Sequence, residues 1–219
     1  MPEILIADDH PLFRDALCRA AAQAVPSATL LQADSVQALL ALVDAHAEAD
    51  LLLLDLHMPG ARGFSALAHL RGQYPQLPII IVSAHEEAEV ARRALAHGAA
   101  GYIPKSLASE SIVAAIRAVL DGEVWLPARM PGAAAELRDA EAEVAARIAE
   151  LTPQQFRVLN MLADGLLNKQ IAYELGISEA TIKAHMTAIM RKLGCNNRTQ
   201  VALVASQLAL DPDTLPANH

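Results

Sequence analysis

Carboxylates, a hydroxyl and an ammonium group follow a series of short apolar segments in the first half of the chain. The residues directly after these segments are Asp8, Asp9, Asp55, Ser83, Ala84 and Lys105. If the segments are parallel strands of one sheet, all of these residues lie along one edge, at the carboxyl ends of the strands. Three carboxylates crowded together repel one another and need a compensating cation. The residue types therefore predict a cation site at this edge.

The same residues have the chemistry needed for phosphoryl transfer. The acidic ligands are all oxygen donors, which favours a hard ion, and we expect Mg²⁺. Lys105 adds a positive point charge and Ser83 a hydroxyl, and a carboxylate can act as the nucleophile. Asp55 follows the central and most apolar segment. Asp55 is therefore predicted to accept the phosphoryl group.

The apolar segments that position these residues are predicted to form an open, doubly wound sheet of five parallel strands. Residues 51–54 and 79–82 are apolar at every position, which is typical of parallel strands covered on both faces. Helical patterns at residues 35–47 and 86–97 lie between strands, and Ser35 and Gly98 are suitable capping residues. The other strands are predicted at residues 4–7, 29–31 and 101–103. This alternation predicts an α/β domain over residues 1–125.

Composition limits the kinds of protein that the chain can be. It has 219 residues, of which 53% are hydrophobic and 19% charged, and this excludes a disordered chain. No apolar run approaches the ~20 residues that span a bilayer, and the first residues lack the pattern of a signal peptide. Cys18 and Cys195 have no metal-ligand spacing. We expect a reduced, cytoplasmic protein with no membrane partner.

Residues 126–150 are predicted to form a partly helical linker. Pro127 and Pro131 interrupt regular structure, and residues 133–150 are rich in Ala and Glu. A narrow apolar stripe runs along this helical stretch and comprises Leu137, Val144, Ile148 and Leu151. The helix either docks on one of the domains or forms a dimer contact.

From Thr152 onward the signals are helical. Thr152 and Gln155 have the spacing of a capping box, with Pro153 at the first helical position. Helices are predicted at residues 152–165, 168–175, 179–193 and 198–208. The second and third are joined by about three residues that include a glycine, which is the helix-turn-helix arrangement.

The helix predicted at residues 179–193 has an apolar face and a basic face. Its outer face carries Lys183, Ala184, Thr187 and Arg191, which suits a helix in the major groove of DNA. Residues 151–209 also contain 6 basic and 3 acidic residues, whereas residues 1–125 contain 8 basic and 15 acidic ones. The side chains expected to reach phosphates are Asn168, Lys169, Thr181, His185, Arg191, Lys192 and Arg198. A small helical bundle with a solvated basic face is the alternative.

Residues 1–125 resemble the receiver domain of two-component response regulators. The residues that carry the resemblance are Asp8-Asp9-His10-Pro11, Asp55 within residues 54–60, Ser83-Ala84 and Gly101-Tyr102-Ile103-Pro104-Lys105-Ser106. The resemblance implies that a sensor histidine kinase donates a phosphoryl group to Asp55. It implies that Asp9, Asp55 and the backbone carbonyl of His57 hold Mg²⁺, with Asp8 acting through water. It also implies that Ser83 moves toward the phosphoryl group and that Tyr102 follows it inward as the switch aromatic.

The C-terminal residues resemble the LuxR-type four-helix DNA-binding domain. The matching segments are residues 151–153, 165–172, 177–185 and 192–194. By this resemblance, Lys183, Ala184 and Thr187 contact bases, and the protein forms a homodimer when phosphorylated or bound to DNA. Leu167 departs from the family pattern, because a serine is more common there, and this puts one capping hydrogen bond in question. A receiver followed by this domain is the architecture of the NarL/FixJ class of response regulators.

Together, these features predict a response regulator that acts as a transcription factor and is not an enzyme. Its predicted parts are a receiver at residues 1–125, a linker at 126–150, and a DNA-binding domain with a C-terminal tail at 151–219. A phosphorylation-independent regulator, with the receiver as an interaction module, is an alternative. A Mg²⁺-dependent phosphohydrolase is disfavoured, because such enzymes usually place the nucleophile in an Asp-x-Asp pattern on the first strand.

Overall fold

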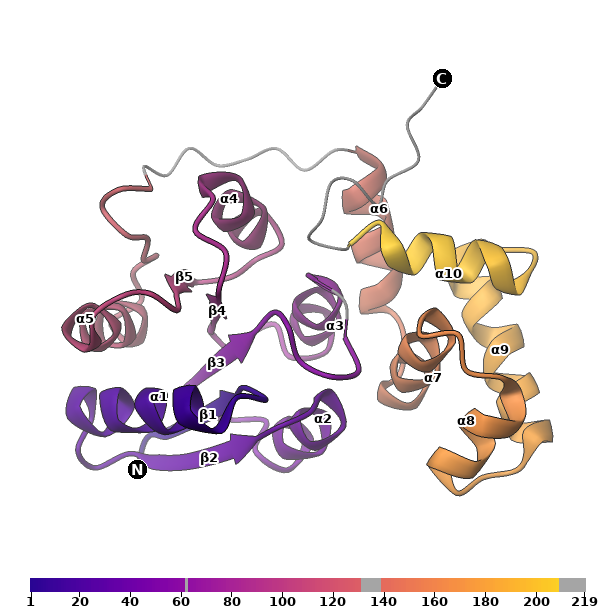
Figure 1. Cartoon of the computed structure of the whole chain (residues 1–219), viewed down its shortest axis with the longest axis horizontal. Helices are drawn as coiled ribbons and strands as arrows, with labels where there is room; N and C mark the ends of the chain where they lie inside the picture. The colour runs from indigo at the N-terminus through magenta and orange to yellow at the C-terminus, as the bar shows by residue number, and fades with distance from the viewer. Residues whose placement is uncertain (62, 131–138, 209–219) are drawn as a thin grey trace. The chain divides into compact units, whose positions relative to one another are not determined.

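The computed structural model describes residues 1–61, 63–130 and 139–208 (Figure 1). The contacts within the chain divide it into two compact units. The first unit comprises Met1–Ala61 and Tyr74–Leu137, and the second comprises Arg62–Gln73 and Arg138–His219. Within the described residues, every helix is too short or too polar to cross a membrane.

A five-stranded parallel sheet forms the centre of the first unit. Its strands lie in the order β2-β1-β3-β4-β5, and every neighbouring pair is parallel. The central strands β3 and β4 are buried along their whole length, as their unbroken apolar sequences predict. The α/β fold expected for this part is therefore confirmed. The strands are β1 (Glu3–Ala7), β2 (Thr29–Ala33), β3 (Leu51–Asp55), β4 (Ile79–Ser83) and β5 (Gly101–Pro104).

Helices cover both faces of this sheet. On one face, α1 (Pro11–Ala24) and α5 (Ser109–Leu120) pack on apolar side chains of β1, β3, β4 and β5. The helices α2 (Val36–Ala45) and α4 (Ala88–Ala96) lie on the other side (Figure 1). The hydroxyl of Ser35 accepts a hydrogen bond from the backbone of Ala38 at 3.3 Å, which confirms the predicted N-cap of α2.

The second unit is entirely helical over the residues that the structure describes. Buried apolar side chains from several of its helices form its core, among them Ile148, Phe156, Ile182 and Val201. The predicted fold class is thus confirmed for this part as well, with α8 and α9 as the helix-turn-helix. Its helices are α3 (Ser65–Gln73), α6 (Asp139–Ala149), α7 (Pro153–Ala163), α8 (Asn168–Leu175), α9 (Glu179–Leu193) and α10 (Arg198–Ser206).

Capping residues define the ends of these helices much as their spacing predicts. Thr152 and Gln155 exchange two hydrogen bonds, of 3.2 and 3.3 Å, and this confirms the capping box of α7. Ser178 accepts a hydrogen bond from the backbone of Thr181 at 3.1 Å and begins α9. Gly194 ends α9 with a φ of 69°, a left-handed conformation that glycine adopts without strain.

The linker helix α6 is part of the second unit. Val144, Ile148 and Leu151 from the predicted apolar stripe are buried, whereas Leu137 lies outside the described residues. A Cβ atom at Gly72 of α3 would lie 2.4 Å from the Cβ atom of Ala149. The glycine therefore allows α3 and α6 to approach closely, and Gln73 Nε2 donates a hydrogen bond to the Ala149 carbonyl at 2.8 Å.

A buried histidine lies where α3 meets α7. The ring of His69 stacks on Phe156, with 4.3 Å between the ring centroids and an interplanar angle of 4°. His69 is fully buried, and the loss of solvation lowers its pKa from 6.5 to about 4. His69 is consequently neutral in the folded protein at physiological pH.

We predict that His69 makes the stability of the second unit depend on pH between 6.5 and 4. The unfolded chain binds a proton on His69 in this range and the folded chain does not. This contribution to stability is complete above pH 6.5 and is lost as the pH falls toward 4, by at most about 3 kcal/mol. Urea unfolding followed by far-ultraviolet circular dichroism should show that His69→Leu loses less stability on acidification than the wild type. Parallel losses in the two proteins would contradict this prediction.

Candidate functional sites

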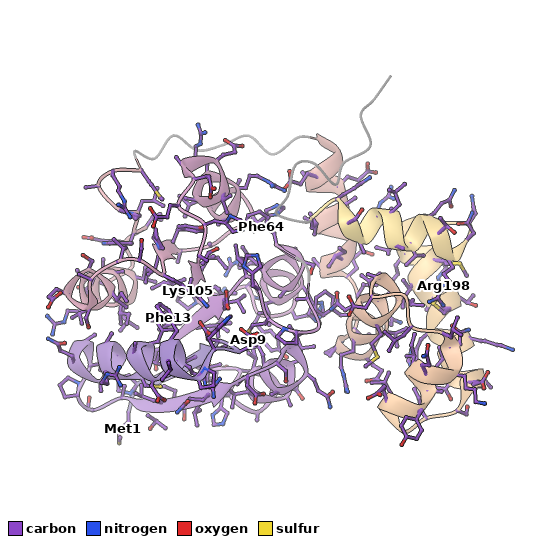
Figure 2. The ribbon with its side chains drawn as sticks, in the orientation of Figure 1. Met1, Asp9, Phe13, Phe64, Lys105 and Arg198 are labelled. Carbon is purple, nitrogen blue, oxygen red and sulfur yellow. The ribbon has the colours of Figure 1, made fainter. Side chains whose placement is uncertain are left out.

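The carboxyl ends of three strands, β1, β3 and β5, bring the predicted acidic and basic side chains together in the first unit. Lys105, directly after β5, places its Nζ atom 2.8 Å from Asp8 Oδ2 and 2.8 Å from Asp55 Oδ2. Asp8 and Asp55 are buried, and Asp9 is half-buried beside them. Figure 2 shows the side chains of Asp9, Phe13 and Lys105 in the same region of this unit. One ammonium group therefore forms ion pairs with two carboxylates, one after β1 and one at the end of β3.

Backbone groups hold the two buried carboxylates in orientation. The N–H of His57 donates to Asp55 Oδ1 at 3.1 Å, and the N–H of His10 donates to Asp8 Oδ1 at 2.8 Å. Each carboxylate thus has one oxygen held by a loop N–H and its other oxygen on Lys105. The backbone of His57 lies directly at Asp55, where the resemblance to receivers implies a carbonyl ligand.

The charged groups of the site are compatible with a bound divalent cation. Burial by itself would lower the pKa of Lys105, but hydrogen bonds and attraction from Asp55 and Asp8 outweigh it and raise the pKa. Lys105 is therefore charged, and it is one ammonium group beside three carboxyl groups. Ligand atoms of Asp8, Asp9, His10 and Asp55 all lie within 4.8 Å of one another. The oxygen-rich cluster is consistent with a metal site.

Ser83 and Tyr102 are connected through the backbone of His85. The hydroxyl of Ser83, at the end of β4, accepts a hydrogen bond from the His85 N–H at 3.2 Å. The Tyr102 hydroxyl donates to the His85 carbonyl at 2.9 Å, and burial raises the pKa of Tyr102 to about 12. Tyr102 is fully buried in this structure, and Ala84 is exposed beside Ser83. The hydroxyls of Ser83 and Tyr102, which the resemblance assigns to the switch, are thus both hydrogen-bonded to the backbone of His85.

Sequence reasoning missed two residues of α1 at this site. Lys105 Nζ lies 4.9 Å from the centre of the Phe13 ring, within the range of a cation–π contact. Arg14 Nη1 donates to the Asp8 carbonyl at 2.6 Å and so fixes the turn after β1. Their proximity to the site depends on how α1 packs after this turn, which no local motif specifies.

In the second unit, α9 has the two faces that its sequence predicts. Ile182, Met186, Ile189 and Leu193 are buried. The outer side chains are exposed, and they are Lys183, Ala184, Thr187 and Arg191. An exposed basic face on the second helix of a helix-turn-helix is suited to the major groove.

The side chains expected to reach phosphates differ in their solvent exposure and in their hydrogen bonds within the protein. Lys169 and Thr181 are exposed, and Asn168 and His185 are half-buried. Lys192 Nζ instead donates to the Glu150 carbonyl at 2.7 Å.

Arg198 is also engaged within the protein, because it donates to Asn168 Oδ1 at 3.2 Å and to the Leu166 carbonyl. This arginine orders the loop that leads into α8. The N–H of Leu167, where the family more often has serine, donates to Gln170 Oε1 at 2.7 Å, so half of the capping interaction is formed.

Comparison with known families gives a match for each part of the chain. Residues 4–117 match the family described as the response regulator receiver domain, and residues 149–205 match the luxR family of bacterial regulatory proteins. A glycerol metabolism activator of Pseudomonas putida is 39% identical over 213 residues, covering 95% of this chain and 96% of the relative. The nitrate/nitrite response regulator protein NarL of Escherichia coli strain K12 is 32% identical, covering 93% and 94%.

Solved structures agree with these matches. The receiver domain of a NarL response regulator from Mycobacterium tuberculosis is 34% identical with a TM-score of 0.51, covering 56% of this chain and 98% of that one. A complex of the response regulator RcsB with DNA has the same fold, at 22% identity and a TM-score of 0.55, covering 95% and 99%.

The chain belongs to the NarL/FixJ class of response regulators, which join a receiver domain to a LuxR-type helix-turn-helix domain. It is a transcription factor that binds DNA through this helix-turn-helix, and its family consists of regulators rather than enzymes.

We predict that Lys105→Met destabilises the first unit by about 3 kcal/mol, because two buried carboxylates lose the cation that they share. A divalent cation should restore part of this loss by binding the folded site. Urea unfolding followed by the fluorescence of Trp125, the only tryptophan, reports on this unit. Lys169→Met, which removes an exposed lysine from the second unit, is the control. Identical unfolding midpoints for both variants would show that the shared ion pair has no such role.

Proposed function

We propose that Asp55 accepts a phosphoryl group from a sensor histidine kinase and that this modification switches sequence-specific DNA binding by α9. The observation that carries the proposal is the sharing of Lys105 Nζ by Asp8 and Asp55, at 2.8 Å from each. This arrangement places the buried carboxylate of Asp55 next to a fixed positive charge. A carboxylate held in this way is suited to act as the nucleophile of phosphoryl transfer.

In the proposed reaction, an oxygen of Asp55 attacks the phosphorus atom of a phosphohistidine. The new P–O bond forms as the P–N bond breaks, and the imidazole leaves with the electron pair of that bond. The His57 N–H orients Asp55 through Oδ1, and Lys105 balances the negative charge that arrives with the phosphoryl group. The phosphorylated side chain remains within reach of the Lys105 ammonium group.

Mg²⁺ is the cation that best fits the donor set. Asp9, Asp55 and the backbone carbonyl of His57 would hold it, with Asp8 acting through water. When bound, Mg²⁺ supplies positive charge that neutralises the phosphoryl oxygens. The support for this assignment is the oxygen-rich cluster, in which three carboxyl groups lie beside one ammonium group.

The switch would start at Ser83. A phosphoryl group on Asp55 offers strong acceptor oxygens, and we propose that Ser83 moves to donate to one of them, next to Ala84. His85 would transmit this movement, because its N–H donates to Ser83 and its carbonyl accepts from Tyr102. Tyr102 would then change its packing together with the loop after β4.

On DNA, we propose that Lys183, Ala184 and Thr187 contact bases. Asn168, Lys169, Thr181, His185 and Arg191 would contact phosphates. The C-terminal part has a small positive charge, so one copy should bind weakly and a homodimer more tightly through effective concentration. Solved complexes of RcsB include dimers bound to DNA, which supports dimerisation of this chain on phosphorylation or DNA binding. A sensor-kinase donor and a DNA target imply action in the cytoplasm.

We predict that a small phosphodonor such as acetyl phosphate, with Mg²⁺, adds one phosphoryl group to the wild type and none to Asp55→Asn. Asp34→Asn is the matched control, because Asp34 also follows a strand at the same edge but is exposed. Intact mass spectrometry counts the phosphoryl groups. Equal labelling of the wild type and Asp55→Asn would remove Asp55 as the acceptor.

Phosphorylation is expected to raise the affinity for DNA about tenfold, which is a common strength of coupling between two sites. The probe is a duplex that the wild-type protein enriches from a random-sequence pool, and fluorescence anisotropy gives the dissociation constant. Asp55→Asn should bind equally with and without the phosphodonor. If the wild type also binds equally in both conditions, the receiver acts independently of phosphorylation.

A further inference from the structure

The end of the linker helix α6 and the end of the recognition helix α9 are joined by two reciprocal contacts. Arg147 of α6 donates from Nη1 to the carbonyl of Leu193, the last residue of α9, at 2.7 Å. Lys192 of α9 donates to the carbonyl of Glu150, just after α6, at 2.7 Å and to Gln155 Oε1 at 2.9 Å. A cation from each helix therefore satisfies a carbonyl at the end of the other.

The contact made by Arg147 completes the cap of α9. Cys195 and Gly194 donate their N–H groups back to Met190 and Arg191, at 2.8 and 3.4 Å. These bonds do not involve the Leu193 carbonyl, which receives the guanidinium instead. The negative end of a helix dipole favours a positive charge at this position.

Gly194 leaves room for the guanidinium. A Cβ atom at Gly194 would lie 2.8 Å from Arg147 Nη1, too close for the two atoms to coexist without a shift. Arg147 Nη2 is also paired with Glu143 at 2.6 Å, one turn earlier on α6, so the guanidinium is held at both ends. The position of Arg147 relative to α9 is therefore well defined.

These cations differ from the basic residues on the outer face of α9. Lys183 and Arg191 are exposed, whereas Lys192 and Arg147 are partly buried and hydrogen-bonded to backbone carbonyls. Arg147 also lies ahead of residues 149–205, the segment that matches the luxR family. The contact thus ties a residue of the linker to the helix that reads DNA.

We propose that Arg147 and Lys192 are positioning residues, which set the orientation of α9 for sequence-specific binding, and that Lys192 does not contact a phosphate. Hydrogen bonds to base edges require the side chains of α9 to be placed accurately in the major groove. Attraction to phosphates depends on charge and tolerates small displacements of the helix. Loosening these contacts should therefore weaken binding to the preferred sequence and leave binding to other sequences nearly unchanged.

The test uses full-length Arg147→Gln with two duplexes, one enriched by the wild type from a random pool and one with the same bases scrambled. Affinity for the enriched duplex should fall about tenfold, because one charge-assisted hydrogen bond is lost. Affinity for the scrambled duplex should change less than about twofold, and the salt dependence should stay the same. Arg191→Gln is the control, because it should weaken binding to both duplexes and make the salt dependence shallower by about one unit of slope.

Two further variants keep the proposal testable. Arg147→Lys retains a positive donor and should recover the preference for the enriched duplex to within about threefold of the wild type, even if Arg147→Gln fails to fold. Lys192→Gln should lower the same preference without changing the salt slope.

A shallower slope for Lys192→Gln would identify Lys192 as a phosphate contact and overturn its part of the proposal. Equal losses on both duplexes, or no loss at all, for the Arg147 variants would overturn the role of Arg147. Because the wild type serves as the reference for DNA binding, each of these failures is distinct from a failure of the chain to bind DNA.

Discussion

The repulsion between carboxylates at the carboxyl edge of the sheet is the constraint on which the receiver depends. Parallel strands bring Asp8, Asp9 and Asp55 together whether or not their charges are balanced, and burial makes the repulsion stronger. Lys105 forms ion pairs with two of these carboxylates, Asp8 and Asp55, through one ammonium group. The remaining oxygen-rich cluster is consistent with a metal site, and a buried carboxylate with a fixed positive neighbour is suited to accept a phosphoryl group. The loop N–H groups at His10 and His57 preserve this geometry.

The DNA-binding part uses its charges in two different ways. Lysine and arginine on the exposed face of α9 are accessible, whereas Arg147 and Lys192 donate hydrogen bonds to backbone carbonyls at the ends of α9 and α6. If the proposal for these two residues holds, the net charge of this part exceeds the charge that is available to phosphates. The linker helix contributes both apolar core and a cap to the recognition helix, so it belongs structurally to the unit that binds DNA.

Much of this could be predicted from local patterns. The unbroken apolar segments of β3 and β4 specify buried parallel strands, and that topology alone places Asp55, Ser83 and Lys105 at one edge. The helix caps at Thr152 and Ser178 follow from spacing within a single turn. Contacts between distant segments were not predictable in this way. Arg147 and Leu193 are 46 positions apart, and nothing in either neighbourhood indicates the other. The sequence predicts a phosphate contact for Lys192 because it is basic and lies on the recognition helix, and its bond to the Glu150 carbonyl depends on tertiary packing. His69 is polar, and its burial against Phe156 depends on which helix α3 meets.

A crystal structure of the full chain with Mg²⁺ and beryllofluoride tests the central claim most directly. Beryllofluoride mimics a phosphoryl group on a carboxylate, so it identifies the acceptor and its surroundings together. The account predicts beryllium on an oxygen of Asp55, fluorine atoms within hydrogen-bonding distance of Lys105 Nζ and Ser83 Oγ, and a cation bound by Asp9. Beryllium on Asp8 or Asp9, or a cation bound away from these carboxylates, would contradict it.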